Sequence, residues 1–368
     1  MNYYDFGLCA GLVDAGCRVT LLTCDETVAE HRVPFELRAS FRGIYGTAPA
    51  WLRGLRFLRD ATLGIVRARL EGSRVFHFHF FHVGTLELWN VLLARIAGGL
   101  VVVTAHDVEA FKEGLSVGPF PRWAYRMSAA VIAHNQVSRA ELIERLKVKD
   151  EKVYVIPHGN YAGFFPQTRD RVAAREGLGL SKTGRVLLFF GQIKEVKGLD
   201  LLLNALAKVR AAVPDIHLVI AGKVWKDSFS RYQAEIDRLK LSEAVTAHIR
   251  YIPDADVDEY FAAADLVVCP YRRIYQSGVV LMAMSIGTPV LASDIPGMAE
   301  VIEDGSTGFL FRSEDIDALA EKLHEVLKDP QRMSDVAHRA RELMERDYGW
   351  TRIGRLTANC YEQALGRG

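Results

Sequence analysis

The run Val186-Leu187-Leu188-Phe189-Phe190-Gly191-Gln192-Ile193-Lys194-Glu195-Val196-Lys197-Gly198 carries the main structural signal of the chain. Its first five residues are apolar, which predicts a buried strand, and an amphipathic pattern over residues 199–212 predicts a helix. The glycines between them allow a ligand to approach the backbone at the start of the helix, where the peptide dipoles favour an anion. Lys194 and Lys197 add positive charge there, so the run predicts a β–α unit with a candidate phosphate site; an ordinary surface junction is the alternative.

The same alternation of buried strand and helix recurs on both sides of this run. Further strands are expected at 18–23, 75–80, 100–104, 130–133 and 153–156, and at 216–221, 245–251, 266–269, 289–292 and 308–311. This alternation is typical of parallel sheets covered by helices. The sequence therefore predicts two doubly wound, Rossmann-like α/β domains, 1–172 and 173–349, with a polar hinge between them and a final segment at 350–368.

The first domain opens unusually, with a helical pattern at residues 3–15 that ends at Gly16 and has no strand before it. Either the domain is built without its usual first strand, or the given chain starts late relative to the natural reading frame. The sequence pattern does not separate these two explanations.

Composition excludes several classes of protein. The 368 residues suffice for two domains, and a formal net charge of +1 gives no reason to expect a nucleic-acid partner. The five cysteines are odd in number and show no CxxC spacing, which favours a reducing compartment. No apolar run is long enough to span a membrane and the N-terminus lacks a signal-peptide pattern, so a cytoplasmic protein is expected.

A second candidate anion site lies at Gln276-Ser277-Gly278-Val279. Ser277 is suited to cap a helix, and Gly278 would leave the backbone N–H groups of the first turn open to a ligand. The helix is expected to end at Gly287, before a buried strand. The alternative is an ordinary buried helix of a doubly wound sheet.

Taken together, these motifs resemble the family 4 (group 1) glycosyltransferases of the GT-B fold, whose two Rossmann-like domains face each other across a cleft. The resemblance covers nearly the whole chain. The sequence at residues 276–279 is similar to that of a bacterial branch of the family that assembles exopolysaccharide or lipopolysaccharide. The motifs that carry it are Gly191-x5-Lys197-Gly198-x-Asp200, Ile220-Ala221-Gly222-Lys223, Tyr260-Phe261-Ala262-Ala263-Ala264-Asp265, Ala283-Met284-x2-Gly287-Thr288-Pro289-Val290, Glu300-Val301-Ile302-Glu303-Asp304-Gly305 and, upstream, Thr104-Ala105-His106-Asp107 and Ile156-Pro157-His158-Gly159-Asn160.

The resemblance implies transfer of a hexose from a nucleoside diphosphate sugar to a lipid-linked saccharide, usually with retention, in cell-surface polysaccharide synthesis. It implies that no metal or other cofactor is needed, that His106 faces the donor sugar, and that the helix at 350–368 returns to the first domain. The residues implied for the diphosphate are Gly191, Lys194, Lys197, Ser277, Gly278 and Val279, and those for the sugar or nucleoside are Gln276, Met282, Lys223 and Ile252.

The sequence departs from the family pattern at three positions. Two glutamates that many members carry are replaced by Ile274 and Met282, and a common arginine is replaced by Gln192. Arg272 or Arg273 is a candidate to recover part of the sugar contacts. The departures leave two rivals open: a partner subunit that has lost transfer, and a nucleotide-sugar epimerase on the same fold. A nicotinamide dehydrogenase is disfavoured because no GxGxxG follows a strand.

Histidines and acids of the first domain supply the remaining catalytic candidates. His77 and His79 alternate at the end of a strand, where a ligand is expected, but they lack a carboxylate or cysteine nearby, so a metal is disfavoured. His79 and His82 are candidates to receive the acceptor, with structural histidines as the alternative. Asp107, ahead of Glu109, is the candidate general base, with helix capping as its alternative.

The segment 32–69 combines eight arginines with many aromatic and apolar residues. On a helix, Arg53, Arg56 and Arg59 would meet anionic lipid phosphates while apolar neighbours enter the headgroup layer. This pattern predicts peripheral contact with the inner face of the plasma membrane. A solvated helix packed on its own domain is the alternative.

Overall fold

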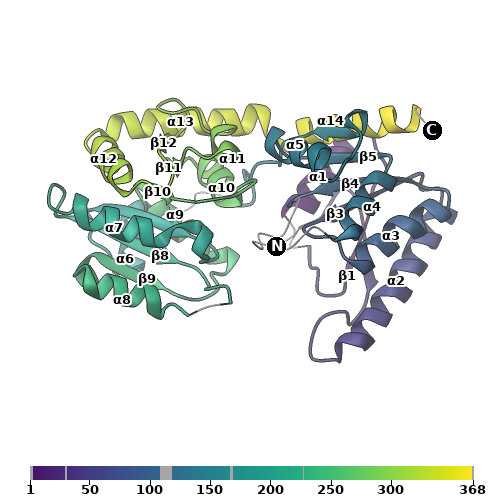
Figure 1. Cartoon of the computed structure of the whole chain (residues 1–368), viewed down its shortest axis with the longest axis horizontal. Helices are drawn as coiled ribbons and strands as arrows, with labels where there is room; N and C mark the ends of the chain where they lie inside the picture. The colour runs from purple at the N-terminus through teal and green to yellow at the C-terminus, as the bar shows by residue number, and fades with distance from the viewer. Residues whose placement is uncertain (1–2, 30, 108–117, 166–168, 227, 367–368) are drawn as a thin grey trace. The chain divides into compact units, whose positions relative to one another are not determined.

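The computed structural model describes residues 3–29, 31–107, 118–165, 169–226 and 228–366, which form two units (Figure 1). Unit 1 contains Met1–Gly159 and Tyr348–Gly368, and unit 2 contains Asn160–Asp347. The division therefore falls earlier than the residue 172 expected from polarity. The reason is hydrogen bonding: Asn160 Nδ2 donates to the Met344 carbonyl (2.8 Å) and the Tyr161 amide to Ser285 Oγ (3.0 Å), which binds this segment to unit 2.

The described residues of unit 1 form two parallel sheets, one of β1 and β2 and one in the order β3-β4-β5-β6. Its described residues begin with a helix, as the sequence pattern predicts. β2 was not expected, because its sequence is charged and only half-buried. The elements are α1 (Tyr3–Asp14), β1 (Thr20–Cys24), β2 (Glu36–Phe41), α2 (Ala50–Leu70), β3 (Val75–Phe80), α3 (Thr85–Ile96), β4 (Leu100–Ala105), α4 (Pro119–Met127), β5 (Ala130–Ala133), α5 (Gln136–Glu144), η1 (Asp150–Lys152), β6 (Val153–Val155) and α14 (Trp350–Gly366).

Helices α1 and α14 pack tightly against each other in unit 1, although they come from opposite ends of the chain (Figure 1). At the crossing, Gly11 and Gly354 have no side chains to keep the backbones apart. A Cβ added at Gly11 would lie 2.0 Å from the Trp350 carbonyl oxygen. Leu8, Leu12 and Ile353 from these helices share a buried core with Val102 of β4 and Ile132 of β5.

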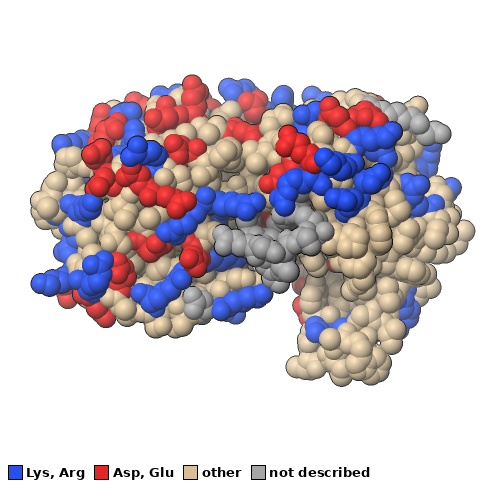
Figure 2. All heavy atoms as spheres, in the orientation of Figure 1, with Lys and Arg blue, Asp and Glu red and all other residues tan. Residues whose placement is uncertain are grey.

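Unit 2 contains one sheet of parallel strands in the order β12-β11-β10-β7-β8-β9. Its visible surface carries interspersed Lys, Arg, Asp and Glu side chains (Figure 2). The elements are α6 (Arg171–Gly177), β7 (Arg185–Phe190), η2 (Glu195–Lys197), α7 (Leu199–Val209), β8 (Ile216–Ala221), α8 (Ser230–Arg238), η3 (Ser242–Ala244), β9 (Val245–His248), α9 (Asp254–Ala263), β10 (Leu266–Cys269), α10 (Gly278–Ile286), β11 (Val290–Ser293), α11 (Pro296–Ala299), β12 (Phe309–Phe311), α12 (Ile316–Leu327) and α13 (Pro330–Asp347).

The strand order of unit 2 determines where a ligand can bind. The chain proceeds from β7 to β8 on one side and places β10 on the other side of β7. The chain leaves β7 toward β8 and leaves β10 toward β11, in opposite directions along the sheet, and such a switch point is where open α/β sheets bind ligands. Both predicted anion-binding loops follow these two strands.

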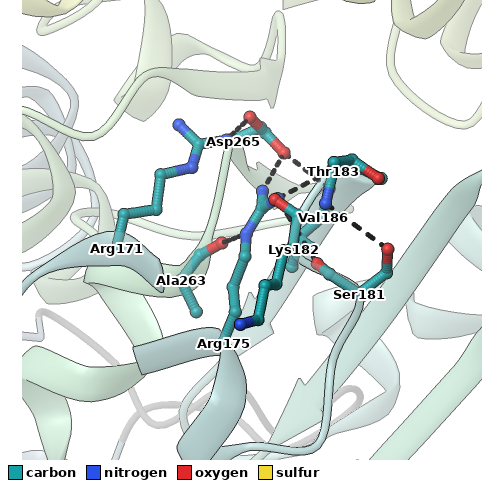
Figure 3. A network of polar contacts seen from close by, with 9 residues as sticks. Arg171, Arg175, Ser181, Lys182, Thr183, Val186, Ala263 and Asp265 are labelled. Carbon is teal, nitrogen blue, oxygen red and sulfur yellow. Dashed lines mark hydrogen bonds and ion pairs between the residues drawn. The ribbon is translucent and has the colours of Figure 1, made fainter. Parts of the chain in front are cut away.

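The opposite, amino-terminal ends of β7 and β10 are held by a buried ion pair (Figure 3). Arg175 of α6 is 2% exposed and donates from Nη2 to Asp265 Oδ2 (2.7 Å), just before β10. Its other nitrogens donate to the carbonyls of Ala263, Lys182 and Gly184 (2.9–3.0 Å), while the Val186 amide donates to the same Asp265 oxygen (2.7 Å). Burial lowers the pKa of Arg175 to about 10, so the side chain stays charged at neutral pH.

Arg175→Met is expected to lower the free energy of unfolding of unit 2 by about 3–5 kcal/mol, because it leaves buried Asp265 with fewer partners. Arg171→Met is the matched control, since Arg171 pairs with the same carboxylate but its side chain is 49% exposed. Its expected loss is below about 1 kcal/mol. Urea denaturation measures both variants, and equal losses would contradict the assignment of this role to the buried arginine.

Candidate active site

The loop after β7 is joined to the loop after β8 by backbone contacts. The Ile193 amide donates to the Lys223 carbonyl (3.0 Å), and the Trp225 amide donates to the Ile193 carbonyl (3.0 Å). Gly222 makes this approach possible, because a Cβ there would lie 1.8 Å from the Gly191 carbonyl oxygen. The Lys223 carbonyl and the Trp225 amide are thus hydrogen-bonded within the protein, whereas the Lys223 side chain is exposed to solvent.

The loop after β7 is also joined to the loop after β10, through Arg272. The Arg272 amide donates to the Val196 carbonyl (2.8 Å), and its guanidinium makes two hydrogen bonds to the Asp200 carboxylate (2.9 and 2.6 Å). The hydrogen bonds to this carboxylate raise the pKa of Arg272, so the side chain stays charged. The sequence made Arg272 a candidate for contacts to the sugar, but in the structure its guanidinium is paired with Asp200 of α7.

Both lysines of the loop after β7 lie over aromatic rings. Lys197 Nζ is 3.6 Å from the centre of the Tyr271 ring, and Lys194 Nζ is 5.0 Å from that of the Trp225 ring. Tyr271 is buried, and burial raises the pKa of its phenol well above the ordinary value, so the ring is neutral. The aromatic faces therefore position both ammonium groups by cation–π attraction without neutralising them.

The amino-terminal end of α10 lies beside the loop after β7. Ser277 Oγ accepts a hydrogen bond from the Val280 amide (3.3 Å), which is the predicted cap. A Cβ added at Gly191 would lie 3.2 Å from Val279 Cγ2, so the two loops touch. Gly278 is exposed, which leaves this turn accessible. Tyr271, which lies under Lys197, is hydrogen-bonded through its side chain to Ser277, so the structure brings together Gly191, Lys197 and the first turn of α10.

The remaining unit 2 candidates differ in accessibility. Gln276 is half-buried beside the α10 cap, whereas Met282 and Ile252 are buried. Met282 is therefore largely removed from water within α10, where a charged glutamate would need compensation. Ile274 is half-buried, and its carbonyl would lie 2.7 Å from a Cβ at Gly297, so this loop is packed against α11.

The predicted histidines of unit 1 form a cluster around the Tyr4 ring. His106 follows β4 and lies 4.5 Å from Tyr4 and 4.4 Å from Phe81 between ring centres. Its Nδ1 is 3.1 Å from Nε2 of His134, which follows β5. Burial, reinforced by neighbouring histidines, lowers the pKa of His106 well below the ordinary value, so its imidazole is neutral.

The other unit 1 candidates surround this cluster. His79 Nδ1 is 2.5 Å from Asp5 Oδ1, and His77 is hydrogen-bonded to Tyr361 and Thr104 (both 2.7 Å). His82 is exposed, and Asp107 is half-buried directly after His106. Glu109 lies outside the described residues. Among the residues that the structure describes, no three His, Cys, Asp or Glu side chains converge in a way that could hold a metal ion.

Helix α2 carries the predicted membrane-binding arginines, and they differ in exposure. Arg59 is exposed, whereas Arg56 is half-buried and donates to the Gly43 carbonyl (3.0 Å). Arg53 is half-buried, and its Nε has no hydrogen-bond partner among the described residues. The exposed residues of the helix after its first residue, Ala50, which we term the outer face of α2, are Trp51, Leu55, Arg59, Leu63, Val66, Arg67 and Leu70.

The outer face of α2 combines large apolar side chains with two arginines. Leu63 and Leu70 are 62% and 84% exposed. In Figure 2 the visible surface over α2, at the lower right, is mainly uncharged. No helix in the described parts of the chain has the length and apolar character required to cross a bilayer.

Several residues that build these sites were given no positioning role from the sequence. Tyr271, Trp225 and Asp200 position the cations of unit 2, and Tyr4 and His134 surround His106. A positional signal was present for Tyr271, because it follows a parallel strand at the carboxyl edge of the sheet. The Asp200–Arg272 pair has no local signal, since its members are 72 residues apart.

Gly198→Ala is expected to destabilise unit 2 by about 2–4 kcal/mol, through left-handed backbone strain and overpacking. Gly198 has φ +65°, and an added Cβ would lie 1.9 Å from the Pro270 carbonyl oxygen. Gly179→Ala is the matched control: its φ is +68° and nothing lies within 4 Å, so strain alone predicts a loss of about 1–2 kcal/mol. Denaturant unfolding compares the two, and a loss at residue 198 no larger than at residue 179 would refute the tight contact.

Comparison with known families covers both units. The family described as "Glycosyltransferase Family 4" matches residues 4–160, and the family described as "Glycosyl transferases group 1" matches residues 170–343. These matches agree with the resemblance that the sequence motifs carry.

Similar proteins include enzymes named D-inositol 3-phosphate glycosyltransferase. The one from Arthrobacter sp. (strain FB24) is 30% identical over 82% of this chain and 73% of its own length. The one from Segniliparus rotundus is 29% identical over 72% of this chain, and the matched region spans 62% of that relative's length. This chain thus spans less than two thirds of some of its curated relatives.

A similar solved structure is that of Anabaena HepE in complex with UDP, at 21% identity and a TM-score of 0.75 over 97% of this chain and 96% of that one. This likeness confirms the predicted α/β fold class, GT-B with Rossmann-like N- and C-terminal domains. With the parallel sheets of both units and the two family matches, it follows that the chain belongs to the group 1, family 4 glycosyltransferases of the GT-B fold.

Proposed function

We propose that this chain transfers a hexose from a nucleoside diphosphate sugar to a saccharide acceptor, with retention of the anomeric configuration. The observation that carries the proposal is the convergence of Gly191, Lys197 and the first turn of α10 at the carboxyl edge of the unit 2 sheet. A lysine beside backbone N–H groups at a helix start is suited to a diphosphate.

The site is best suited to stabilise the negative charge of the departing diphosphate. As the bond to the sugar breaks, negative charge grows on the leaving oxygen. Lys197, held over Tyr271, and the amides of Ser277, Gly278 and Val279 supply positive charge that is already in position. Preorganised charge of this kind stabilises a transition state without reorganisation, and we propose that it takes the place of a metal ion.

The donor is proposed to be a UDP-sugar. Support comes from the structural likeness to Anabaena HepE, which was solved in complex with UDP. We further assign His106 to a hydroxyl of the donor sugar, His79 and His82 to the acceptor, and Asp107 to the base that accepts the acceptor's proton. Asp107 is half-buried immediately after His106, as this assignment requires.

The acceptor is proposed to be lipid-linked, in cell-surface polysaccharide synthesis of the bacterial exopolysaccharide or lipopolysaccharide type. The outer face of α2 supports a peripheral position at an anionic membrane, because exposed apolar residues there accompany Arg59 and Arg67. These arginines are paired with Asp60 and Glu71, but their side chains remain 62% and 66% exposed. The relatives' names favour a second candidate acceptor, D-inositol 3-phosphate, which needs no membrane.

Lys197→Ala is expected to weaken UDP-glucose binding about tenfold to a hundredfold, because it removes a charge-assisted contact to the diphosphate. Thermal shift at increasing UDP-glucose concentration measures this, since a ligand that binds the folded state raises its melting temperature. The shift of the unaltered protein is expected to be the same with and without EDTA.

Lys208→Ala is the control for that experiment, because Lys208 lies on α7 and is paired with Asp317 at the surface. It should leave the shift unchanged. Equal shifts for the wild type and Lys197→Ala would contradict the diphosphate assignment. No shift with UDP-glucose or the corresponding GDP, dTDP and ADP sugars would favour a partner subunit that has lost transfer.

The double variant Arg59→Glu, Arg67→Glu is expected to bind anionic liposomes roughly tenfold to thirtyfold more weakly, because each basic residue near such a surface contributes about 1 kcal/mol. Co-sedimentation with phosphatidylglycerol vesicles measures the loss. The matched control is Arg341→Glu, Arg346→Glu on α13, which changes the net charge equally and also reverses arginines paired with neighbouring acids. Equal recovery of all three proteins would remove the membrane proposal and favour the soluble acceptor.

A further inference from the structure

A chain of hydrogen bonds in unit 1 starts at the backbone carbonyl of Ile156, which can only accept. His134 Nδ1 lies 3.0 Å from the carbonyl oxygen of Ile156, directly after β6. A carbonyl oxygen can only accept, so the proton lies on His134 Nδ1. A neutral imidazole carries one proton, which leaves a lone pair on His134 Nε2.

The same argument then determines the proton position on His106. Its Nδ1 lies 3.1 Å from His134 Nε2, which accepts. His106 Nδ1 must therefore carry the proton, and Nε2 of His106 keeps the lone pair. Each ring is constrained by the one before it, so the Ile156 carbonyl determines the tautomer of His106 through His134.

Both rings are in surroundings that disfavour a second proton. His106 is 9% exposed and His134 is 5% exposed. Burial lowers the pKa of His134 to about 3. Among the described residues, the rings that face His106 are those of Tyr4, Phe81, His79, His134 and His158, and Asp5 is hydrogen-bonded to His79 instead.

Aromatic packing holds the plane of the His106 ring. Phe81 stacks on it with an angle of 9° between planes, and Tyr4 meets it edge-on at 81°. Between these two contacts and the bond to His134, the direction of Nε2 is set by tertiary structure. The imidazole therefore presents an acceptor in a fixed orientation.

We propose that His134 is a positioning residue that keeps His106 as a hydrogen-bond acceptor at Nε2, so that the enzyme selects neutral donor sugars over uronic acids. The inference rests on the proposed function, in which His106 meets the donor sugar, and it assigns Nε2 to the C6 substituent, where a hexose carries a hydroxyl and a uronic acid a carboxylate. A sugar hydroxyl donates to Nε2. The carboxylate of a uronic acid, ionised at neutral pH, has no proton to donate and meets a lone pair, which is repulsive.

The tautomer is tested first, in a measurement that involves no substrate. In a two-bond ¹H–¹⁵N correlation spectrum of protein labelled at histidine nitrogens, wild-type His106 is expected to show a protonated Nδ1 and an unprotonated Nε2. Loss of signals in His106→Asn identifies this residue. A protonated Nε2 in the wild type would overturn the proposal before any variant of His134 is made.

Two substitutions of His134 then separate positioning from packing. His134→Gln retains an N–H donor for Ile156 and a carbonyl acceptor for His106 Nδ1, whereas His134→Leu removes both. The glutamine variant is expected to keep the wild-type tautomer, and the leucine variant to show a mixture of tautomers. An unchanged spectrum for a folded His134→Leu protein would overturn the role of His134.

Selectivity is measured by binding of UDP-glucose and UDP-glucuronic acid to the same proteins. The wild type and His134→Gln are expected to prefer UDP-glucose by about tenfold or more, as for a site whose buried polar group would be left unpaired. His134→Leu should lose most of this preference while UDP itself binds equally to all three. Equal affinities of the wild type for both sugars, with the expected tautomer present, would overturn the selectivity. If UDP and both sugars fail to bind, the proposed function fails, and the spectrum alone still decides the tautomer.

Discussion

The loops of unit 2 meet because glycine backbones allow a closer approach than any side chain would. Gly222 lies against the Gly191 carbonyl, and Gly198 lies against the Pro270 carbonyl. These contacts join the loops after β7, β8 and β10 at the carboxyl edge of one sheet. Every group proposed to hold the diphosphate depends on that junction, because Lys197 precedes Gly198 and the α10 turn touches Gly191. Larger residues would separate the loops and disperse the charges.

Two ion pairs with different surroundings hold the two ends of β7 and β10. At the amino-terminal ends, Arg175 and Asp265 are buried and also bind backbone groups, so breaking that pair would leave charges without water. At the carboxyl ends, Arg272 and Asp200 are partly exposed. The first pair therefore contributes mainly to stability, and the second mainly to the positions of the loops that carry the site.

Unit 1 uses neutral groups where unit 2 uses charged ones. His77, His106, His134 and His158 are kept unprotonated by burial, which lowers each pKa. Neutral imidazoles act as directed groups, because each ring carries one N–H donor and one nitrogen that accepts. The chemistry available at His106 consequently depends on which nitrogen carries its proton, and that is a property of the whole cluster.

Local sequence determined the elements and their order, whereas tertiary structure determined which elements meet. The strand of residues 186–190, the Ser277 cap and the positions of the loops after β7 and β10 were predictable, because hydrophobic periodicity and capping act over a few residues. The half-exposed strand β2 was not predicted, because charged residues interrupt the apolar pattern that indicates a strand. The domain division depends on the hydrogen bond from Asn160 to Met344. The position of the Arg272 side chain depends on its pairing with Asp200, and the tautomer of His106 depends on the Ile156 carbonyl. Each of these joins residues far apart in the chain, so no local pattern records it and only the folded backbone brings the partners together.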